Sequence, residues 1–385
     1  MNIVYSTQAV VEYDGSHYYS NAVEATYRRY CNDGDRIRII CYCKKVIVPT
    51  QNKIDDERIS FVFVNKVNNI NAILRGDVSQ NKIIVRNIVE KSDFCFAHLP
   101  SSHGRQVVEA AKEMGIPCMN VIVGCPWDSY WNYGWRGMLI APFAYLSLRR
   151  IQKNALYSIY VTKDFLQKRY PTTGKSIGCS NVSIQTGIGD VLEKRYERIN
   201  NHETSGNLKI GTAAAIDVPF KGQEYVIMAL AKLKKRGIIY EYHLIGKGNK
   251  NRLEHIAKQQ DVINQVFFHG AIPHHEVLDF FDNIDIYIQP SKQEGLPRAL
   301  IEAMSRGCLC FGSKIAGIPE LLDDDYLFPK GDAHKIAMQL ESISSDSLRE
   351  QAKRNFDIAK SYDYQILDQR RAQFISEFYN LCRPE

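Results

Sequence analysis

No apolar run in this sequence approaches the roughly 18 residues that a membrane-spanning helix needs. The longest candidate, residues 138–148, is interrupted by Pro142 and is too short to cross a bilayer. The first residues, 1–5, are typical of a strand and carry neither the basic region nor the cleavage site of a signal peptide. We therefore expect a cytoplasmic protein that is neither membrane-spanning nor secreted.

The cysteines lack the spacing of a zinc site or a disulfide framework. Neither Cys41-x-Cys43 nor Cys308-x-Cys310 has a nearby His or third Cys at metal-binding distance along the chain. Most of the ten cysteines lie in apolar runs, where a thiol behaves as a small hydrophobic group. We expect reduced thiols, no structural metal and no bound cofactor. A composition of 45% hydrophobic and 24% charged residues excludes disordered and fibrous classes.

Positive charge is concentrated in one stretch, residues 127–175, which holds eight Lys/Arg, two acidic residues and all three tryptophans. Its apolar residues are Met138, Leu139, Ile140, Phe143, Leu146 and Leu148, and its nearest cations are Arg149, Arg150 and Lys153. This mixture suits an anionic membrane surface or nucleic acid. Since no nucleic-acid-binding motif accompanies it, we expect peripheral attachment of the N-terminal domain to the inner face of the plasma membrane. A helix that packs its apolar face on its own domain is the alternative.

Two alternations of strand-like and helix-like segments indicate two parallel, helix-covered sheets. In the first half we expect strands at residues 2–6, 36–41, 60–64, 93–97, 118–123 and 158–161, with helices at 21–31 and 105–114. In the second half we expect strands at 209–213, 240–245, 266–269, 284–289 and 308–312, with helices at 223–236, 274–282 and 297–306. Gly237 is the expected C-cap of the helix at 223–236.

The polar stretch at residues 193–207 separates the two alternations and predicts a linker. We expect an N-terminal, acceptor-side Rossmann-like domain at 1–192 and a C-terminal nucleotide-sugar-binding domain at 208–363. A last helix, 364–382, is expected to pack back on the first domain. Ligands of such sheets bind at the carboxyl ends of the strands, so two such edges facing across a cleft would form the active site.

The segment with the most specific chemistry runs from Ser291 to Ala303. It places Glu294 in the loop after the strand at 284–289 and Glu302 in the following helix. Pro297 suits the first helical position, and a helix N-terminus attracts phosphate. Glu302 lies opposite the helix's apolar face, so its carboxylate can bind a ribose diol. Pairing of Glu302 with Arg298 or Arg306 would be a purely structural alternative.

This Glu294-x7-Glu302 pattern resembles the signature of family-4 glycosyltransferases, which are retaining enzymes with the GT-B fold. Further matching motifs stand in the same order: Phe220-Lys221-Gly222, Leu244-Ile-Gly246-Lys-Gly248, Phe268-His-Gly270 and Gly317-Ile-Pro319-Glu320. The resemblance is strong over residues 208–322 and weak elsewhere. Within that family, the sequence most resembles bacterial enzymes that build capsule or lipopolysaccharide chains.

The resemblance implies a metal-independent hexosyl- or N-acetylhexosaminyltransferase that uses a UDP- or GDP-linked sugar and a glycan or lipid-linked acceptor. It implies that Glu294 contacts the transferred sugar, Glu302 the ribose and Lys221 the diphosphate. The remaining donor-binding residues it implies are Gly246, Gly248, Gly295, Leu296, Pro297 and Arg298. Many relatives carry an Arg near the place of Ala215. Either Lys221 and the helix amides suffice without it, or another cation such as Lys292 or Arg298 substitutes.

Two sites in the first half lie at expected strand ends. His98 follows the strand at 93–97, where relatives often place a His that contacts the donor sugar; a backbone-bonded histidine is equally compatible. Trp127 and Asp128 follow the strand at 118–123, and Asp128 is either an acceptor-side base or a helix cap. His103 is interpreted as structural. The run Asp323–Asp325 contains Asp-x-Asp but is interpreted as a solvated turn.

Two other functions fit the same fold. A GT-B epimerase would bind a nucleotide-sugar without transferring it, and a non-catalytic GT-B subunit of a transferase complex would explain the missing Arg. The pairing of Glu294 with Glu302 favours a transferase, because it implies a grip on sugar and ribose together.

Overall fold

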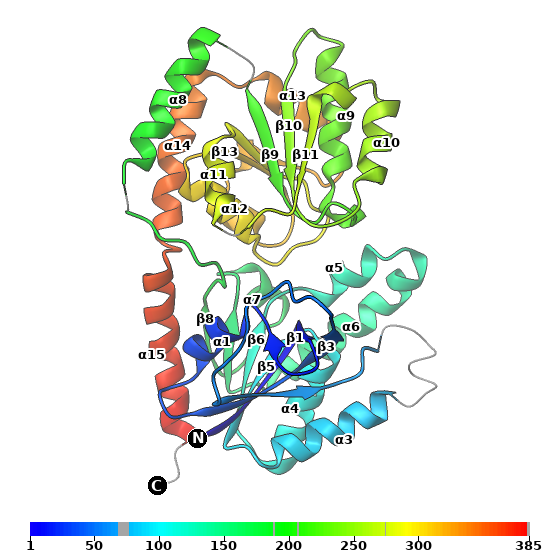
Figure 1. Ribbon diagram of the computed structural model, residues 1–385, viewed down its shortest axis with the longest axis vertical. Coiled ribbons are helices and arrows are strands. Elements are labelled where there is room, and N and C mark those ends of the chain that lie inside the picture. Colours follow the sequence, from blue (N-terminus) through cyan, green and yellow to red (C-terminus); the bar gives the residue numbers. More distant parts are fainter. Residues whose placement is uncertain (68–76, 188, 206–207, 274, 383–385) are drawn as a thin grey trace. The chain divides into compact units, whose positions relative to one another are not determined.

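The computed structural model describes residues 1–67, 77–187, 189–205, 208–273 and 275–382. The chain forms two compact units (Figure 1). The first unit comprises Met1–Pro126, Pro142–Cys179 and Asp368–Glu385, and the second comprises Trp127–Ala141 and Ser180–Leu367. This grouping differs from the domain boundaries expected from the sequence, because residues 127–141 and 180–192, which were expected in the first domain, group with the second unit.

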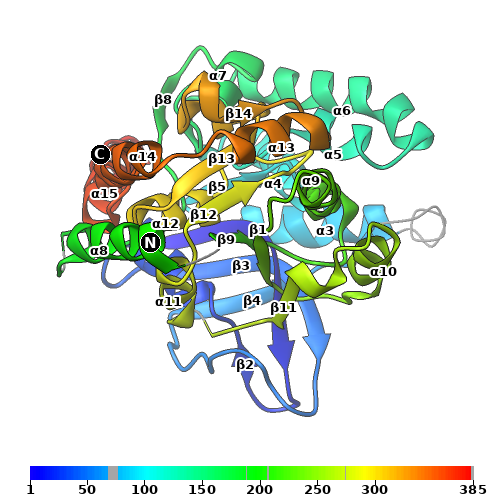
Figure 2. The same ribbon diagram turned by 90° about the horizontal axis from the view of Figure 1, so that it is seen from above.

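The first unit contains the parallel sheet expected from the alternating pattern. Its strands are β1 (Asn2–Tyr13), β2 (Tyr18–Tyr19), β3 (Arg36–Lys45), β4 (Ile59–Phe63), β5 (Phe94–Leu99), β6 (Cys118–Ile122), β7 (Tyr157–Tyr160) and β8 (Lys175–Gly178). The order is β4-β3-β1-β5-β6-β7-β8, and β2 pairs antiparallel with β1. A register shift between Ser6 and Val10 lets β1 continue well beyond its expected end, and Figure 2 shows β1 and β3 running on to β2.

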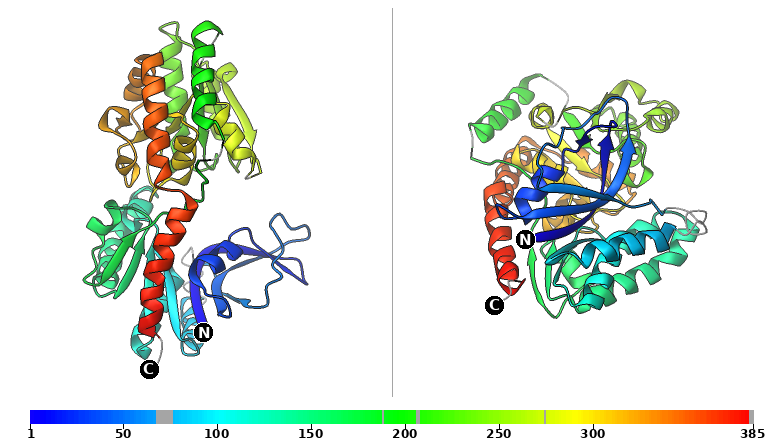
Figure 3. Two further views of the ribbon diagram at one scale, coloured as in Figure 1. Left: turned by 90° about the vertical axis from the view of Figure 1, so that its left-hand side faces the viewer. Right: turned by 60° about the horizontal axis from the view of Figure 1, so that its bottom comes forward.

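Helices cover both faces of this sheet. They are α1 (Val23–Tyr30), α3 (Asp77–Val89), α4 (Ser102–Met114), α7 (Phe165–Arg169) and α15 (Tyr364–Cys382). Helix α5 (Pro126–Trp131) belongs to the second unit except for Pro126, and α6 (Trp135–Lys153) contributes its residues from Pro142 onward to the first unit. On α15, the Phe378 ring meets that of Phe94 edge-on at 5.4 Å. The Tyr379 hydroxyl bonds to the Tyr30 carbonyl and the Asp35 carboxylate at 3.0 and 2.7 Å. These contacts hold the C-terminal part of α15 beside the start of β1 (Figure 3).

The second unit contains a second parallel sheet, in the order β11-β10-β9-β12-β13-β14. Its strands are β9 (Lys209–Ala213), β10 (Glu241–Ile245), β11 (Val266–Gly270), β12 (Ile286–Gln289), β13 (Leu309–Ser313) and β14 (Leu327–Phe328). Its helices are α8 (Val191–Ser205), α9 (Gln223–Lys234), α10 (Asn251–Gln259), α11 (Glu276–Asp282), α12 (Arg298–Ser305), α13 (Ala333–Glu341) and α14 (Ser345–Lys360). Two parallel-sheet α/β units confirm the predicted fold class.

The apolar stripe predicted for α9 forms part of the core of this unit. Val226, Leu230 and Leu233 are fully buried together with residues of the sheet. The helix ends at Lys234 with Lys235 as its C-cap, so the predicted C-cap at Gly237 was two residues too late. The Gly237 amide still bonds back to the Lys234 carbonyl, at 3.0 Å.

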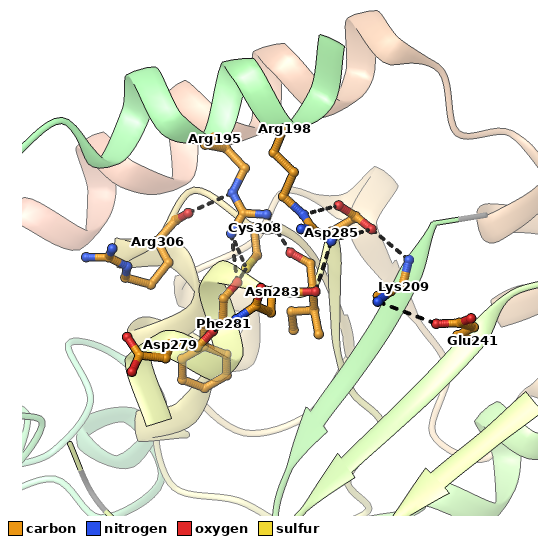
Figure 4. Close-up of polar contacts among 11 residues, drawn as sticks. Arg195, Arg198, Lys209, Glu241, Asp279, Phe281, Asn283, Asp285, Arg306 and Cys308 are labelled. Carbon is orange, nitrogen blue, oxygen red and sulfur yellow. Dashed lines mark hydrogen bonds and ion pairs between the residues drawn. The ribbon is translucent and has the colours of Figure 1, made fainter. Parts of the chain in front are cut away.

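The polar stretch interpreted as a linker is instead largely helical, within α8. Its polarity is misleading, because two of its arginines bond to polar groups inside the second unit (Figure 4). The buried Arg195 guanidinium donates to the carbonyls of Phe281 and Arg306 at 2.7 and 2.9 Å. Arg198 bonds to Asp285 at 2.7 Å. Arg195 therefore satisfies carbonyls at the ends of α11 and α12, as a cation near a helix C-terminus does.

Replacing Arg195 with alanine is expected to lower the free energy of unfolding of the second unit by about 3 kcal/mol, since buried carbonyls would lose their donor. The matched control is Arg349→Ala on α14, where the side chain is 39% exposed and a change of under about 0.5 kcal/mol is expected. Urea unfolding followed by circular dichroism measures both. Equal midpoints for the two variants would contradict this role of Arg195.

Candidate active site

A cavity of about 500 Å³ opens at the carboxyl ends of the central strands of the second unit. Its wall is formed by Ala213 at the end of β9, Ala214 and Ala215 after it, Ile245 at the end of β10, Gly246 and Lys247 after it, Ala271, Ile272 and Val277 around the start of α11, Gln289 on β12, and Lys221, Glu294, Leu296, Pro297, Arg298, Ala299 and Glu302. The lining therefore combines an apolar part with three cations and two carboxylates. That combination fits a ligand with a flat ring at one part and negative charge at another.

Glu294 is held by three donors that all bond to one of its carboxylate oxygens, Oε1. The Lys221 ammonium and the Ser291 hydroxyl both lie 2.6 Å from it, and the Gln289 amide nitrogen lies at 3.1 Å. Gln289 is fixed in turn by the Tyr287 hydroxyl, at 2.6 Å from its amide oxygen. The second oxygen, Oε2, makes no hydrogen bond within the described residues and remains able to accept one from a ligand in the cavity.

The position of Lys221 depends on a close approach of two loops. Gly222 has a φ of 72°, and a Cβ there would overlap the carbonyl oxygen of Pro290. Next to it, the Lys292 amide donates to the Phe220 carbonyl at 2.7 Å. The turn that carries Lys221 is thereby bound to the loop that carries Glu294, which explains why the two charges meet.

Helix α12 presents its first turn to the same cavity. Pro297 is the N-cap, with ψ 115°, and not the first helical residue that the sequence suggested. The N-cap offers no side-chain hydrogen bond to the first turn, so the amides there remain available to an anionic ligand. Glu302 lines the cavity from the second turn. Of the two arginines suggested as its structural partners, Arg306 bonds to Asp282 at 2.7 and 2.6 Å, and Arg298 lines the cavity beside Glu302.

The glycines after β10 serve the packing of neighbouring loops. Gly246 has a φ of 149°, and a Cβ there would overlap the carbonyl oxygen of Ala214. The Ile216 amide bonds to the Lys247 carbonyl at 2.9 Å. These contacts hold the loops after β9 and β10 together, so that Gly246 and Lys247 reach the cavity wall. Gly248 and Gly295 do not line the cavity in the described part of the chain.

The structure separates the two cations considered as replacements for an Arg near Ala215. Arg298 lines the cavity, as does Lys247, which the sequence analysis did not single out. Lys292 is bonded to the buried Glu224 at 3.1 Å and does not line it. Of the two candidates, Arg298 is therefore the one placed with Lys221.

The residues that hold Glu294 were not predicted from the sequence. Ser291 and Gln289 are buried, and their position at the end of an apolar strand was the available signal. Polar residues at the carboxyl end of a central parallel strand are well placed to support a site.

The candidate residues of the first half are distributed over both units. His98 is the second-last residue of β5 in the first unit. Burial, together with the charge of nearby His103, lowers the pKa of His98 from 6.5 to about 4. Its imidazole is therefore neutral at neutral pH. His103 is buried and donates from Nε2 to the Thr7 carbonyl at 2.7 Å, which agrees with a structural role. Trp127 and Asp128 group with the second unit, where Trp127 stacks on Trp131 at 5.3 Å.

The remaining acidic and sulfur groups do not form a site in the described residues. Asp323 pairs with Arg354 at 2.6 Å and Asp324 with Lys314 at 2.8 Å, as expected for an exposed turn. No set of three His, Cys, Asp or Glu side chains in the described ranges has metal-binding geometry. All ten cysteines are free thiols. In the same part of the chain, no helix combines the length and the apolarity needed to span a bilayer.

Comparison with known proteins gives the class of the fold first. The chain superimposes on the Anabaena protein Alr3699/HepE, solved in complex with UDP-glucose, with a TM-score of 0.65 at 16% identity, over 98% of this chain and all of that one. The fold is therefore GT-B, with two Rossmann-like units.

Residues 198–358 of the second unit match the model of the family "Glycosyl transferases group 1". Protein CapJ of Staphylococcus aureus is 29% identical over 89% of this chain and 86% of its own length. The putative colanic acid biosynthesis glycosyltransferase WcaL of Escherichia coli (strain K12) is 30% identical over 40% of this chain and 42% of its own.

Proposed function

We propose that this protein is a retaining family-4 glycosyltransferase that moves a hexosyl or N-acetylhexosaminyl group from a UDP- or GDP-linked sugar to a glycan, in the synthesis of a cell-surface polysaccharide. The observation that carries the proposal is the cavity in which Lys221, Glu294, Glu302 and the first turn of α12 meet. The name of WcaL, a putative colanic acid biosynthesis glycosyltransferase, supports a role in polysaccharide synthesis. The UDP-glucose bound to HepE supports a nucleotide-sugar as the donor.

Each group has a part in this reaction. When the bond between C1 of the sugar and the diphosphate oxygen breaks, negative charge develops on the diphosphate, where Lys221, Arg298 and the α12 amides stabilise it. Glu294 accepts a hydrogen bond from a sugar hydroxyl through Oε2 and so orients C1. Glu302 binds the ribose hydroxyls. The acceptor hydroxyl forms the new bond to C1 on the face from which the diphosphate leaves, and its proton passes to the departing diphosphate oxygen.

We further propose that transfer needs no divalent metal, since cations of the chain itself face the leaving group. We also propose that the acceptor is lipid-linked. In this proposal His98 contacts the donor sugar, and Trp127 and Asp128 contact the acceptor.

A panel of UDP- and GDP-sugars tests the proposal, with released nucleotide as the readout and lipid-linked glycans as acceptors. One donor should be consumed in the presence of EDTA, and NMR should show the donor's anomeric configuration in the product. Interconversion of donor sugars without nucleotide release would identify an epimerase instead. Absence of both nucleotide binding and turnover would leave a non-catalytic subunit.

A further inference from the structure

Helix α6 has an inner side fixed to the fold by small and polar residues. Ala141 and Gln152 are completely buried and Leu148 nearly so. The Gln152 side chain bonds to the side chains of Asn120 and Tyr160, at 2.9 and 2.8 Å. Because both nitrogen and oxygen of this buried amide are bonded, the helix cannot turn its other side inward without breaking the network.

The outer side of α6 is the more apolar one. Leu139, Phe143 and Leu146, spaced at i, i+4 and i+7, are 63%, 74% and 60% exposed. Met138 and Ile140 beside them are also exposed. Of the six apolar residues that the sequence assigned to a docking surface, Leu148 alone is buried, so that assignment was wrong for Leu148. The alternative in which the apolar face packs on its own domain does not hold for this side of the helix, where five apolar side chains are exposed together. Exposed apolar side chains that gather on one face mark a candidate interaction site.

Charge selects what this outer face binds. Helix α6 contains Arg136, Arg149, Arg150 and Lys153 and no Asp or Glu. None of the four is paired with a carboxylate in the described residues, and three stand in the last two turns, directly after the apolar stripe. Cations at the border of an exposed apolar stripe are typical of helices that lie in the head-group region of anionic membranes. A second copy of the chain fits less well, because two such helices would bring like charges together.

We propose that α6 docks the protein on an anionic bilayer, with Leu139, Phe143 and Leu146 at the acyl boundary and the cations of its last turns among lipid phosphates. The helix lies in the membrane surface and does not cross it. The surface stands independently of the proposed reaction, because no donor or acceptor takes part in the binding.

Flotation with vesicles of phosphatidylcholine, with or without phosphatidylglycerol, tests the proposal on the full chain. Binding should need phosphatidylglycerol and weaken with salt. Arg150→Glu/Lys153→Glu should reduce the bound fraction at least about tenfold, whereas the matched control Lys232→Glu/Lys235→Glu on exposed positions around the end of α9 should bind like the wild type. Phe143→Ser/Leu146→Ser, which changes exposed side chains only, should also lose binding while keeping the wild-type circular dichroism.

Two results would overturn this proposal. Equal binding to neutral and anionic vesicles, or equal loss in the α6 and α9 charge variants, would show that these cations do not recognise lipid phosphate. Concentration-dependent dimers in light scattering without lipid, abolished by Phe143→Ser/Leu146→Ser, would make the face an interface between copies. Nucleotide binding measured on the same samples separates either result from a failure of the proposed reaction.

Discussion

Replacing Glu294 by glutamine is expected to lower kcat by about a hundredfold or more while leaving the Kd of the nucleoside diphosphate within about threefold. Glutamine keeps the size of the side chain but removes the negative charge that Lys221 contacts at 2.6 Å. It also weakens the acceptor that Oε2 offers to a sugar hydroxyl. Because this hydroxyl belongs to the transferred sugar, loss of its hydrogen bond to Glu294 should affect turnover far more than binding of the nucleotide. Released nucleotide and isothermal titration calorimetry measure the two effects.

Glu302→Gln is the contrasting variant for this prediction. Glu302 lines the cavity from the second turn of α12, so its loss should raise the Kd of the nucleoside diphosphate by about ten- to a hundredfold, the value of a hydrogen bond to a charged group. Circular dichroism and thermal unfolding should show that both variants fold. Wild-type turnover in Glu294→Gln, or the same pattern of effects in both variants, would contradict the separate roles.

The contact between Lys221 and Glu294 could be predicted from the sequence only in part. Strand β12, the loop and α12 are each predictable from pattern, and so is the placement of Glu294 at a carboxyl edge. The two charged residues stand 73 positions apart in the sequence, and they come together because Gly222, which has no Cβ, allows the close approach to Pro290. A glycine's partner in space cannot be predicted from a single sequence, since nothing in its neighbours specifies which loop it meets.

Polarity misled the sequence analysis at α8 for an identifiable reason. Arg195 and Arg198 look like the surface residues of a linker, because arginine is mostly exposed. In the structure the carbonyls that end α11 and α12 require a donor, and α8 supplies it from a segment distant in sequence. Such a requirement appears only when the ends of the two short helices are seen beside α8 (Figure 4). Helix α6 shows the converse, since its apolar residues were recognised but their direction was set by the Gln152 network.

Lys221→Met is expected to lower kcat by about 10²- to 10³-fold and to weaken nucleoside diphosphate binding as well, because the ammonium is the cation bonded to Glu294 inside the cavity. The methionine keeps the length of the stem and removes only the charge and its hydrogen bonds. Lys292→Met is the matched control, since Lys292 is bonded to Glu224 and lies outside the cavity wall. Its kcat should stay within about threefold of the wild type.

Arg298→Met places the second cation in the same series. If Arg298 replaces the basic residue that is absent at Ala215, its loss should lower kcat by about ten- to a hundredfold. The effect should be smaller than that of losing Lys221, because the Arg298 variant keeps the ammonium that is bonded to Glu294. Measured against one donor at saturating concentration, kcat should therefore fall in the order Lys292→Met, Arg298→Met, Lys221→Met. If Lys292→Met proved as damaging as Lys221→Met, the diphosphate would have to bind nearer Glu224 than the cavity described here. Wild-type activity of all three variants would show that the diphosphate does not bind in this cavity.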